Sequence, residues 1–322
     1  MILVAIQHED GVPDRLSVEA LTLARALAAE TGDPLHAVAW GPASAATAGA
    51  LGTAGVAVLH AIDDVRLTDY APEAIGAGIA QLVARDSPAA VIGTGDDRGT
   101  EIMAHVGART GLPMTANCTA IRTGDPWQAT RQRWGGSLLE EAHLDGSTRL
   151  LTVAPHALEP APAAAPTATA VERFSAELTE RDLRVRVSSR VPAAAGAISL
   201  ADARVVVGGG RGVGSAEGFA QLDELASLLG GTVGVSRVVT SAGWRPHAQQ
   251  VGQTGTRIAP DLYIACGISG AIQHMVGARS AKAILAINTD RDSPMVTRAT
   301  YAVIGDLHAI LPAIIAEVRA AR

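Results

Sequence analysis

Val205-Val-Val-Gly-Gly-Gly-Arg-Gly-Val-Gly214 is a β-branched run that leads into a cluster of glycines. The residues after it predict a helix over Gly218–Leu229 and a strand over Thr232–Val235. A strand, a helix and a second strand in this order form a βαβ unit, in which the two strands are parallel. The stretch therefore predicts an α/β fold with a parallel, doubly wound, Rossmann-like sheet for the C-terminal part of the chain.

The same alternation of strands and helices extends toward both ends of the chain. Downstream, a buried strand starts at Leu262 and meets Gly267, and further strands are predicted over Ala283–Ile287 and Tyr301–Ile304. Upstream, the predicted elements are strands over Ile2–Ile6, Leu35–Ala39, Val56–Leu59 and Ala90–Ile92, and helices over Ser17–Glu30 (capped by Ser17), Glu73–Arg85 and Gly99–Thr110 (closed by Gly111). Residues 115–153 are richer in β-forming residues, and strands are predicted over Trp127–Trp134 and Leu150–Val153.

Two stretches of the chain interrupt this alternation. Glu159–Thr169 holds three prolines, which favour an extended loop over a helix or a strand ladder. Val191-Pro-Ala-Ala-Ala-Gly196 is the second, and the strand and helix pattern restarts after it. At about 100–200 residues per domain, a chain of 322 residues predicts two domains. We place them at 1–192 and 193–322, each with a parallel-sheet α/β architecture.

Composition excludes several classes of protein. Hydrophobic residues make up 48% of the chain and charged residues 18%, so a disordered or fibrous chain is excluded. The net charge of −6 argues against sequence-independent nucleic-acid binding, which needs a basic surface. Two cysteines cannot form a disulfide framework, and no apolar run approaches the roughly 20 residues that cross a bilayer. We therefore expect a cytoplasmic protein without membrane insertion.

The glycine-rich turn at 208–214 has the make-up of a diphosphate site. Glycine lets the backbone approach phosphate groups, a helix N-terminus supplies N–H donors, and Arg211 adds a fixed positive charge. The spacing differs from G-x-G-x-x-G, and Ser236-Arg237 follows the second strand where an NAD site carries an acidic residue. A tight strand–helix turn without a ligand is the alternative.

Polar residues also follow the other predicted strands. Gln250-Val-Gly-Gln-Thr-Gly255 could lie flat against a ring and offer the Thr254 hydroxyl, although taken alone an ordinary polar loop is favoured. Ser269 is predicted to cap a helix that contains His274. Asn288 and Asp306 stand at two further strand ends, where parallel sheets bind ligands, and helix capping is the alternative for Asp306. The nine histidines show no metal-binding or triad spacing, so no metal and no catalytic residue is expected.

Three runs of sequence closely resemble the α subunit of electron transfer flavoproteins, the FixB family. They are Gln250–Ile258, Asp261–His274 and Ala286–Asp290. The likeness continues more weakly through the first domain, where it includes Gly93–Gly99 and Leu150–Pro155. The resemblance implies a heterodimer with a smaller β subunit and one FAD held mainly by residues 193–322. It also implies that residues 1–192 bind no nucleotide and serve in subunit packing, with AMP or a second FAD in the β subunit.

The resemblance also implies which residues contact the FAD. Arg211 is expected at the diphosphate. Ser236 and Arg237 are expected at the isoalloxazine ring, with Arg237 over the ring. Those that line the ring are Val251, Gly252, Gln253 and Thr254, with Thr254 at N5. The ribityl chain and diphosphate are wrapped by Ser269, Gly270, Ala271, Ile272, Gln273 and His274, with His274 near the C2 carbonyl. The adenosine part is held by Asn288, Asp306 and Leu307.

The function that this resemblance implies is electron transfer. Reduction puts negative charge on the N1–C2=O edge of a flavin, and a nearby guanidinium stabilises that charge. We expect an electron carrier, not an enzyme, that takes electrons from flavin dehydrogenases and passes them to an acceptor such as a quinone-linked reductase. The alternatives are an NAD-linked flavin-dependent oxidoreductase, an electron-bifurcating flavoprotein of the same family, and a non-redox adenine-nucleotide-binding protein.

Overall fold

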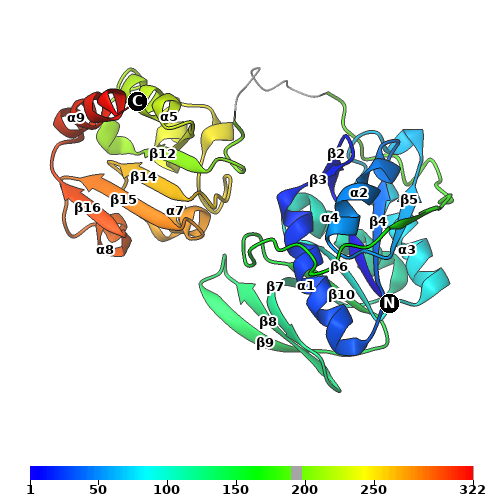
Figure 1. The fold of residues 1–322 in the computed structure, drawn as a ribbon. Helices are drawn as coiled ribbons and strands as arrows, with labels where there is room; N and C mark the ends of the chain where they lie inside the picture. Colours follow the sequence, from blue (N-terminus) through cyan, green and yellow to red (C-terminus); the bar gives the residue numbers. More distant parts are fainter. Residues whose placement is uncertain (190–197, 322) are drawn as a thin grey trace. The chain divides into compact units, whose positions relative to one another are not determined.

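Two separate β-sheets organise the chain. The computed structural model describes residues 1–189 and 198–321, and the chain divides into the units Met1–Val191 and Pro192–Arg322 (Figure 1). Each unit has its own sheet flanked by helices, which makes both of them α/β. The boundary that we predicted at residue 192 lies outside the described residues, and the exact limits of the domains stay a prediction.

The sheet of the first unit is mostly parallel. Its strand order is β11-β5-β4-β1-β6-β10-β7-β8-β9, and every pair from β11 to β7 is parallel, whereas β7, β8 and β9 pair antiparallel. The strands are β1 (Ile2–Ala5), β4 (Leu35–Trp40), β5 (Val58–Ile62), β6 (Ala90–Thr94), β7 (Met114–Arg122), β8 (Trp127–Arg133), β9 (Leu138–Leu144), β10 (Arg149–Val153) and β11 (Ala170–Arg173). A small separate ribbon pairs β2 (His8–Glu9) with β3 (Val12–Pro13).

Helices cover both faces of this sheet, which explains why its central strands read as continuous apolar runs. Along β1, Ile2 and Val4 pack into one hydrophobic cluster and Leu3 and Ala5 into another. Side chains of a strand alternate between its two faces, so a strand covered on both sides is apolar throughout. The helices are α1 (Arg15–Thr31), α2 (Ala48–Thr53), α3 (Pro72–Asp86) and α4 (Asp97–Thr110).

Several boundaries in this unit differ from those predicted. The cap of α1 is Asp14 and not Ser17, because the Asp14 carboxylate accepts a hydrogen bond from the Ser17 amide at 2.7 Å. The buried Ser17 hydroxyl instead accepts a hydrogen bond from the Gln7 amide at 2.9 Å. Strand β5 begins at Val58 and not at Val56, whose amide bonds to the carbonyl of Leu51 at the end of α2. The predicted loop at 159–169 is observed, but it leads into β11, which we did not predict.

The sheet of the second unit is entirely parallel and has the order β13-β12-β14-β15-β16. Numbered within the unit this order is 2-1-3-4-5, which reverses between the first and third strands. The elements are β12 (Val205–Gly209), α5 (Phe219–Leu228), β13 (Thr232–Val235), α6 (Arg237–Ser241), β14 (Leu262–Cys266), α7 (Ile272–Ala278), β15 (Ala283–Asn288), α8 (Pro294–Arg298), β16 (Tyr301–Ile304) and α9 (Leu307–Ala320). The predicted doubly wound architecture is confirmed.

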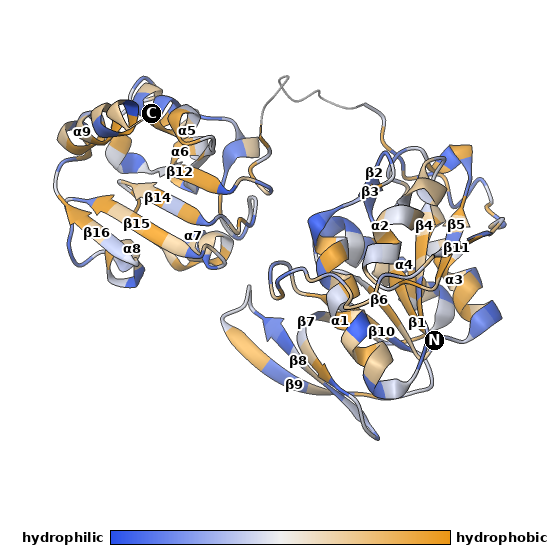
Figure 2. Cartoon of the chain, in the orientation of Figure 1, coloured by the Kyte–Doolittle hydropathy of each residue, from blue (hydrophilic) through white to orange (hydrophobic). Residues whose placement is uncertain are grey.

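Two hydrophobic clusters again lie on opposite faces of the sheet. Val207 and Ile264 pack with α5 and α9, whereas Val206, Tyr263 and Ala265 pack on the other face. Figure 2 shows the inner strands of both units as largely hydrophobic. Within residues 1–189 and 198–321, no helix is long and apolar enough to cross a membrane.

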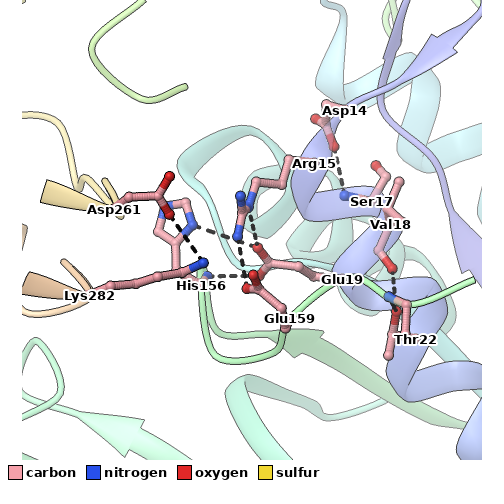
Figure 3. Close-up of polar contacts among 11 residues, drawn as sticks. Asp14, Arg15, Ser17, Val18, Glu19, Thr22, His156, Glu159, Asp261 and Lys282 are labelled. Carbon is pink, nitrogen blue, oxygen red and sulfur yellow. Dashed lines mark hydrogen bonds and ion pairs between the residues drawn. The ribbon is translucent and has the colours of Figure 1, made fainter. Parts of the chain in front are cut away.

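A buried carboxylate ties helix α1 to the loop after β10 (Figure 3). Glu19 is only 1% exposed, and its side chain accepts hydrogen bonds from the His156 amide at 2.8 Å and from Arg15 Nε at 3.2 Å. Arg15 also pairs with the exposed Glu159 at 3.1 Å. Burying a carboxylate is costly unless such partners compensate it. The cluster therefore holds the 154–159 segment against α1.

We expect Glu19→Ala to destabilise the first unit by about 2–4 kcal/mol, because it leaves the His156 amide and the Arg15 guanidinium without their common acceptor. Hydrogen-exchange mass spectrometry of peptides from α1 measures the loss. Glu159→Ala is the matched control, since it removes a partner of the same arginine from an exposed position and should cost less than about 1 kcal/mol. Equal effects of the two substitutions would contradict this account.

Candidate functional site

The reversal of strand order in the second unit brings two glycine loops together. The loop after β12 contacts the loop after β14, and the Gly210 and Gly212 amides donate to the carbonyls of Cys266 at 2.9 Å and Gly267 at 3.1 Å. A Cβ atom on Gly210 would lie 2.2 Å from the Gly267 oxygen, and one on Gly212 would lie 2.7 Å from its Cα. Gly267 itself has φ +61°, which favours glycine. Only glycine permits this approach.

A cleft of about 760 Å³ opens above these loops, at the carboxyl ends of the strands. Each of the five strands of the sheet contributes the residues that follow it, and the loop at 250–254 closes one side. Its volume falls in the range of small-molecule and cofactor sites, about 300–1,000 Å³. The predicted site residues that line it are Arg211, Ser236, Arg237, Val251, Gly252, Gln253, Thr254, Ser269, Gly270, Ala271, Gln273, His274, Asn288, Asp306 and Leu307.

The lining of the cleft differs from the predicted set of contacts: one predicted residue is absent and ten further residues are present. Ile272, at the start of α7, does not line the cleft, and its side chain is 61% exposed to solvent. Gly267 and Gly305 could have been found from their positions directly after predicted strands. The lining residues that we did not predict as ligand contacts are Gly212, Val238, Ser241, Gln250, Gly267, Ile268, Thr289, Asp290, Ser293 and Gly305.

Of two expectations about helix N-termini, the start of α5 is confirmed within one residue and the cap of α7 is wrong. A single 3₁₀ turn (Arg211–Val213) follows β12, and α5 starts at Phe219, next to the predicted Gly218. The positive charge of this loop therefore comes from Arg211 and not from the end of α5. Ser269 does not cap α7, which begins after Ala271; its carbonyl accepts a hydrogen bond from the Met295 amide at 3.1 Å.

A chain of hydrogen bonds holds the Thr254 hydroxyl. Thr240 Oγ1 donates to Gln250 Oε1 at 2.6 Å, and Gln250 Nε2 donates to Thr254 Oγ1 at 3.0 Å. Gln250 is 2% exposed, so its amide is firmly placed. Because Thr254 Oγ1 accepts this bond, its own proton remains available as a donor toward the cleft. The residue that fixes Thr254 is thus Gln250, which we predicted in the loop but not among the ligand contacts.

His274 is a buried, neutral imidazole. It is 7% exposed, and its Nε2 atom lies 2.8 Å from the Tyr263 hydroxyl. Burial lowers the pKa of His274 to about 4, and the nearby Val251 backbone offsets this only in part. The ring is therefore uncharged at neutral pH.

The positive charge in the cleft comes from two arginines, whereas its two carboxylates, Asp290 and Asp306, lie beyond β15 and β16. Arg211 and Arg237 are exposed residues two positions beyond the ends of β12 and β13, and neither forms an ion pair within the described parts of the chain. The polar residues at the other end of the cleft are already engaged. Asn288 donates to the Ile268 carbonyl at 3.0 Å, and Asp306 caps α9 by accepting from the His308 amide at 2.9 Å. The capping role considered for Asp306 is confirmed.

Two buried polar atoms at the cleft are left without partners among the described residues, His274 Nδ1 and Ser293 Oγ. Buried polar groups are rarely unpaired unless a ligand or water completes them. At Gly252, φ is +143° and a Cβ atom would lie 2.9 Å from the Gln273 carbonyl, so the backbone there packs without a side chain. Two arginines without ion pairs to the described residues, together with two unpaired buried polar atoms, suit an elongated anionic ligand such as a dinucleotide.

The family of the chain follows from comparison with known proteins. Residues 2–179 match the family model of the electron transfer flavoprotein domain, and residues 199–279 match the electron transfer flavoprotein FAD-binding domain. The chain belongs to the electron transfer flavoprotein α-subunit family. The resemblance noted in the sequence is thereby confirmed, and the second unit is a FAD-binding domain of this family.

Similar proteins extend over nearly the whole chain. The electron transfer flavoprotein subunit alpha of Thermoanaerobacterium thermosaccharolyticum is 32% identical, with 99% of this chain and 97% of the relative covered. That of Mycobacterium tuberculosis is 36% identical, with 99% and 98% covered, and Protein FixB of Clostridium saccharobutylicum is 34% identical, with 99% and 96% covered. Among solved structures, a putative thiamin diphosphate-dependent enzyme from Mycobacterium smegmatis is 12% identical, with 98% of this chain and 59% of that enzyme's chain covered and a TM-score of 0.25.

The burial of His274 predicts a pH-dependent stability. A histidine with an ordinary pKa of 6.5 when unfolded and about 4 when folded binds its proton more readily in the unfolded chain. Its contribution is therefore complete above pH 6.5 and is lost as the pH falls toward 4. Between pH 7 and pH 5 we expect it to cost about 2 kcal/mol.

Urea unfolding at the two pH values, followed by hydrogen exchange in β14, tests this. His274→Gln should remove the pH-dependent component, and His247→Gln, at an exposed position in the same unit, should keep it. Identical pH dependence in all three proteins would show that His274 is not the group responsible.

Proposed function

We propose that FAD occupies the cleft of the second unit and that the chain works as the α subunit of a heterodimeric electron carrier. The observation that carries this proposal is the convergence of the ring, diphosphate and adenosine residues on one cleft of a FAD-binding domain. The cleft lies at the switch point of the sheet, where open α/β folds bind their ligands. FAD, when bound, supplies the transfer of one or two electrons.

The residues after β12 and β13 provide the positive end of the site. Arg237, at the start of α6, is proposed to lie over the ring, with Ser236 beside it, and Arg211 to contact the diphosphate. An arginine remains protonated at any physiological pH and stacks on planar rings, so it offers a constant charge. Two guanidinium groups that form no ion pair with the described residues can turn to a ligand without breaking such a pair.

The loop at 250–254 and the start of α7 provide donors without charge. Thr254 is proposed to donate to N5 of the ring, and Val251, Gly252 and Gln253 to pack along it. His274 is proposed to approach the C2 carbonyl. Because its imidazole is neutral, it acts through a hydrogen bond and leaves the electrostatic contribution to Arg237.

The remaining walls are assigned to the rest of the cofactor. Gln273 and the backbone of 269–271 are proposed to follow the ribityl chain and the diphosphate. Asn288, Asp306 and Leu307 are proposed to hold the adenosine part, and Asp290 and Ser293 join them from the loop after β15. Ile272, which does not line the cleft, is proposed to serve a different contact from the one that the family resemblance implies.

The chain itself is proposed to transform no substrate. Its contributions are binding, orientation of the ring and a fixed field, and the partner is a smaller β subunit that carries AMP or a second FAD. We propose that the first unit packs on that subunit and binds no nucleotide. Flavin dehydrogenases are the proposed donors, a quinone-linked reductase or similar oxidoreductase the acceptor, and the cytoplasm the compartment.

We expect Arg237→Ala to lower the reduction potential of the bound FAD, because the negative charge that forms on reduction loses its nearest fixed cation. A spectroelectrochemical titration of the heterodimer measures the potential. Arg298→Ala is the control, since it removes an exposed arginine of the same unit that does not line the cleft. An Arg237→Ala potential equal to that of the control would count against the assignment.

We expect the α chain alone to hold FAD at least about tenfold more weakly than the heterodimer. Val238 lines the cleft yet is 49% exposed, and Arg237 beside it is exposed too, so the ring end of the site is open to solvent without a partner. Fluorescence titration with FAD, with and without the coexpressed β subunit, gives the two dissociation constants, and tenfold corresponds to about 1.4 kcal/mol. Stoichiometric yellow α chain purified by itself would refute an intersubunit site.

A further inference from the structure

Beneath the cleft lies a buried pair of polar side chains, of which only one has a proposed contact with FAD. Tyr263 on β14 is completely buried, and its hydroxyl lies 2.8 Å from His274 Nε2. The two rings stack, with centroids 6.1 Å apart and an angle of 26° between their planes. Of the two, only His274 lines the cleft. Tyr263 can therefore influence a ligand only through the imidazole.

The direction of this hydrogen bond follows from the surroundings of the tyrosine. Burial raises the pKa of Tyr263, with a further contribution from Cys266, so the hydroxyl keeps its proton. The structure records His274 as its hydrogen-bond partner. If Nε2 were the donor, the hydroxyl proton would remain unpaired in the core, which costs about 1–3 kcal/mol. The hydroxyl is thus the donor and Nε2 the acceptor.

The other nitrogen of the His274 ring, Nδ1, is consistent with a hydrogen bond donated by Tyr263 to Nε2. A neutral imidazole carries one proton, so an accepting Nε2 places that proton on Nδ1. No described residue forms a hydrogen bond with Nδ1, so this donor is left for a ligand.

We propose that Tyr263 is a positioning residue that holds His274 as the Nδ1–H tautomer, so that the imidazole offers the ligand a hydrogen-bond donor and not an acceptor. The proposal rests on the proposed function, because the ligand atom must be an acceptor such as a ring carbonyl oxygen. An imidazole of the other tautomer would place a lone pair against that oxygen and repel it.

The neighbouring strand is shaped to keep the tyrosine in place. A Cβ atom on Gly208 of β12 would lie 2.3 Å from the Tyr263 hydroxyl and 2.6 Å from Cζ. Glycine at this position therefore leaves room for the end of the ring. Gly208→Ala would displace the hydroxyl without removing it, which gives a second way to break the contact.

The test uses the FAD-loaded heterodimer labelled with ¹⁵N-histidine. Long-range ¹H–¹⁵N correlation spectra distinguish the two tautomers, and His274→Gln identifies the His274 signals by their loss. We expect the Nδ1–H tautomer in the wild-type protein. In Tyr263→Phe, which keeps the ring, we expect a mixture of tautomers, an FAD dissociation constant raised about two- to tenfold, and a lower reduction potential, because only the Nδ1–H fraction binds fully.

Tyr301→Phe is the matched control, since it removes the hydroxyl of a tyrosine that is 67% exposed on β16 and should change none of these values. Gly208→Ala should behave like Tyr263→Phe. An Nε2–H or doubly protonated His274 in the wild-type protein overturns the proposal even if both variants fail to fold. An unchanged tautomer in a folded Tyr263→Phe protein overturns it too, and so does a changed tautomer with unchanged affinity and potential.

The outcomes separate this proposal from the proposed function. A wild-type heterodimer that binds no FAD refutes the proposed function, and the tautomer measured in that colourless protein still decides whether Tyr263 sets the state of His274. A heterodimer that binds FAD and shows the Nε2–H tautomer refutes the role of Tyr263 alone.

Discussion

The contact between Gly210, Gly212 and Gly267 is the constraint on which the rest of the site depends. Parallel strands β12 and β14 are neighbours, but the helices that follow them, α5 and α7, pack on opposite faces of the sheet. The loop after β12 and the loop after β14 therefore lead to opposite faces from the switch point. The loops bond to each other through backbone groups at 2.9 and 3.1 Å, which satisfies their polar atoms without side chains. The cleft is the space that remains above this floor.

Side chains around the floor fall into two kinds that divide the chemistry of the site. Arg211 and Arg237 are exposed, charged and free to turn toward a ligand. Gln250, Tyr263 and His274 are buried, neutral and held by hydrogen bonds, so they present donors in fixed directions. A flexible cation supplies attraction over a distance, whereas a fixed dipole costs no reorganisation when charge develops nearby. The cleft combines both kinds within one unit.

Much of the fold could be predicted because its strands are buried on both faces and stand out as apolar runs. Elements without that signal were missed. Strand β11 is exposed along its whole length and joins the sheet by pairing with β5. No local sequence pattern predicts that pairing. The cap of α1 was misplaced because a serine hydroxyl can serve several backbone partners, and that of Ser17 bonds to the Gln7 amide from outside the helix. The cap of α7 was misplaced because this helix begins two residues later, after Ala271.

The sequence by itself determined the alternation of strands and helices, the family likeness and the residue types at the strand ends, since these depend on local composition and order. Only the tertiary structure decided which polar atoms are paired. The neutrality of His274, the hold of Gln250 on Thr254 and the direction of the Tyr263 hydrogen bond all depend on burial and on neighbours distant in the chain. A side chain's charge and proton position are set by its surroundings, and these exist only once the chain has folded.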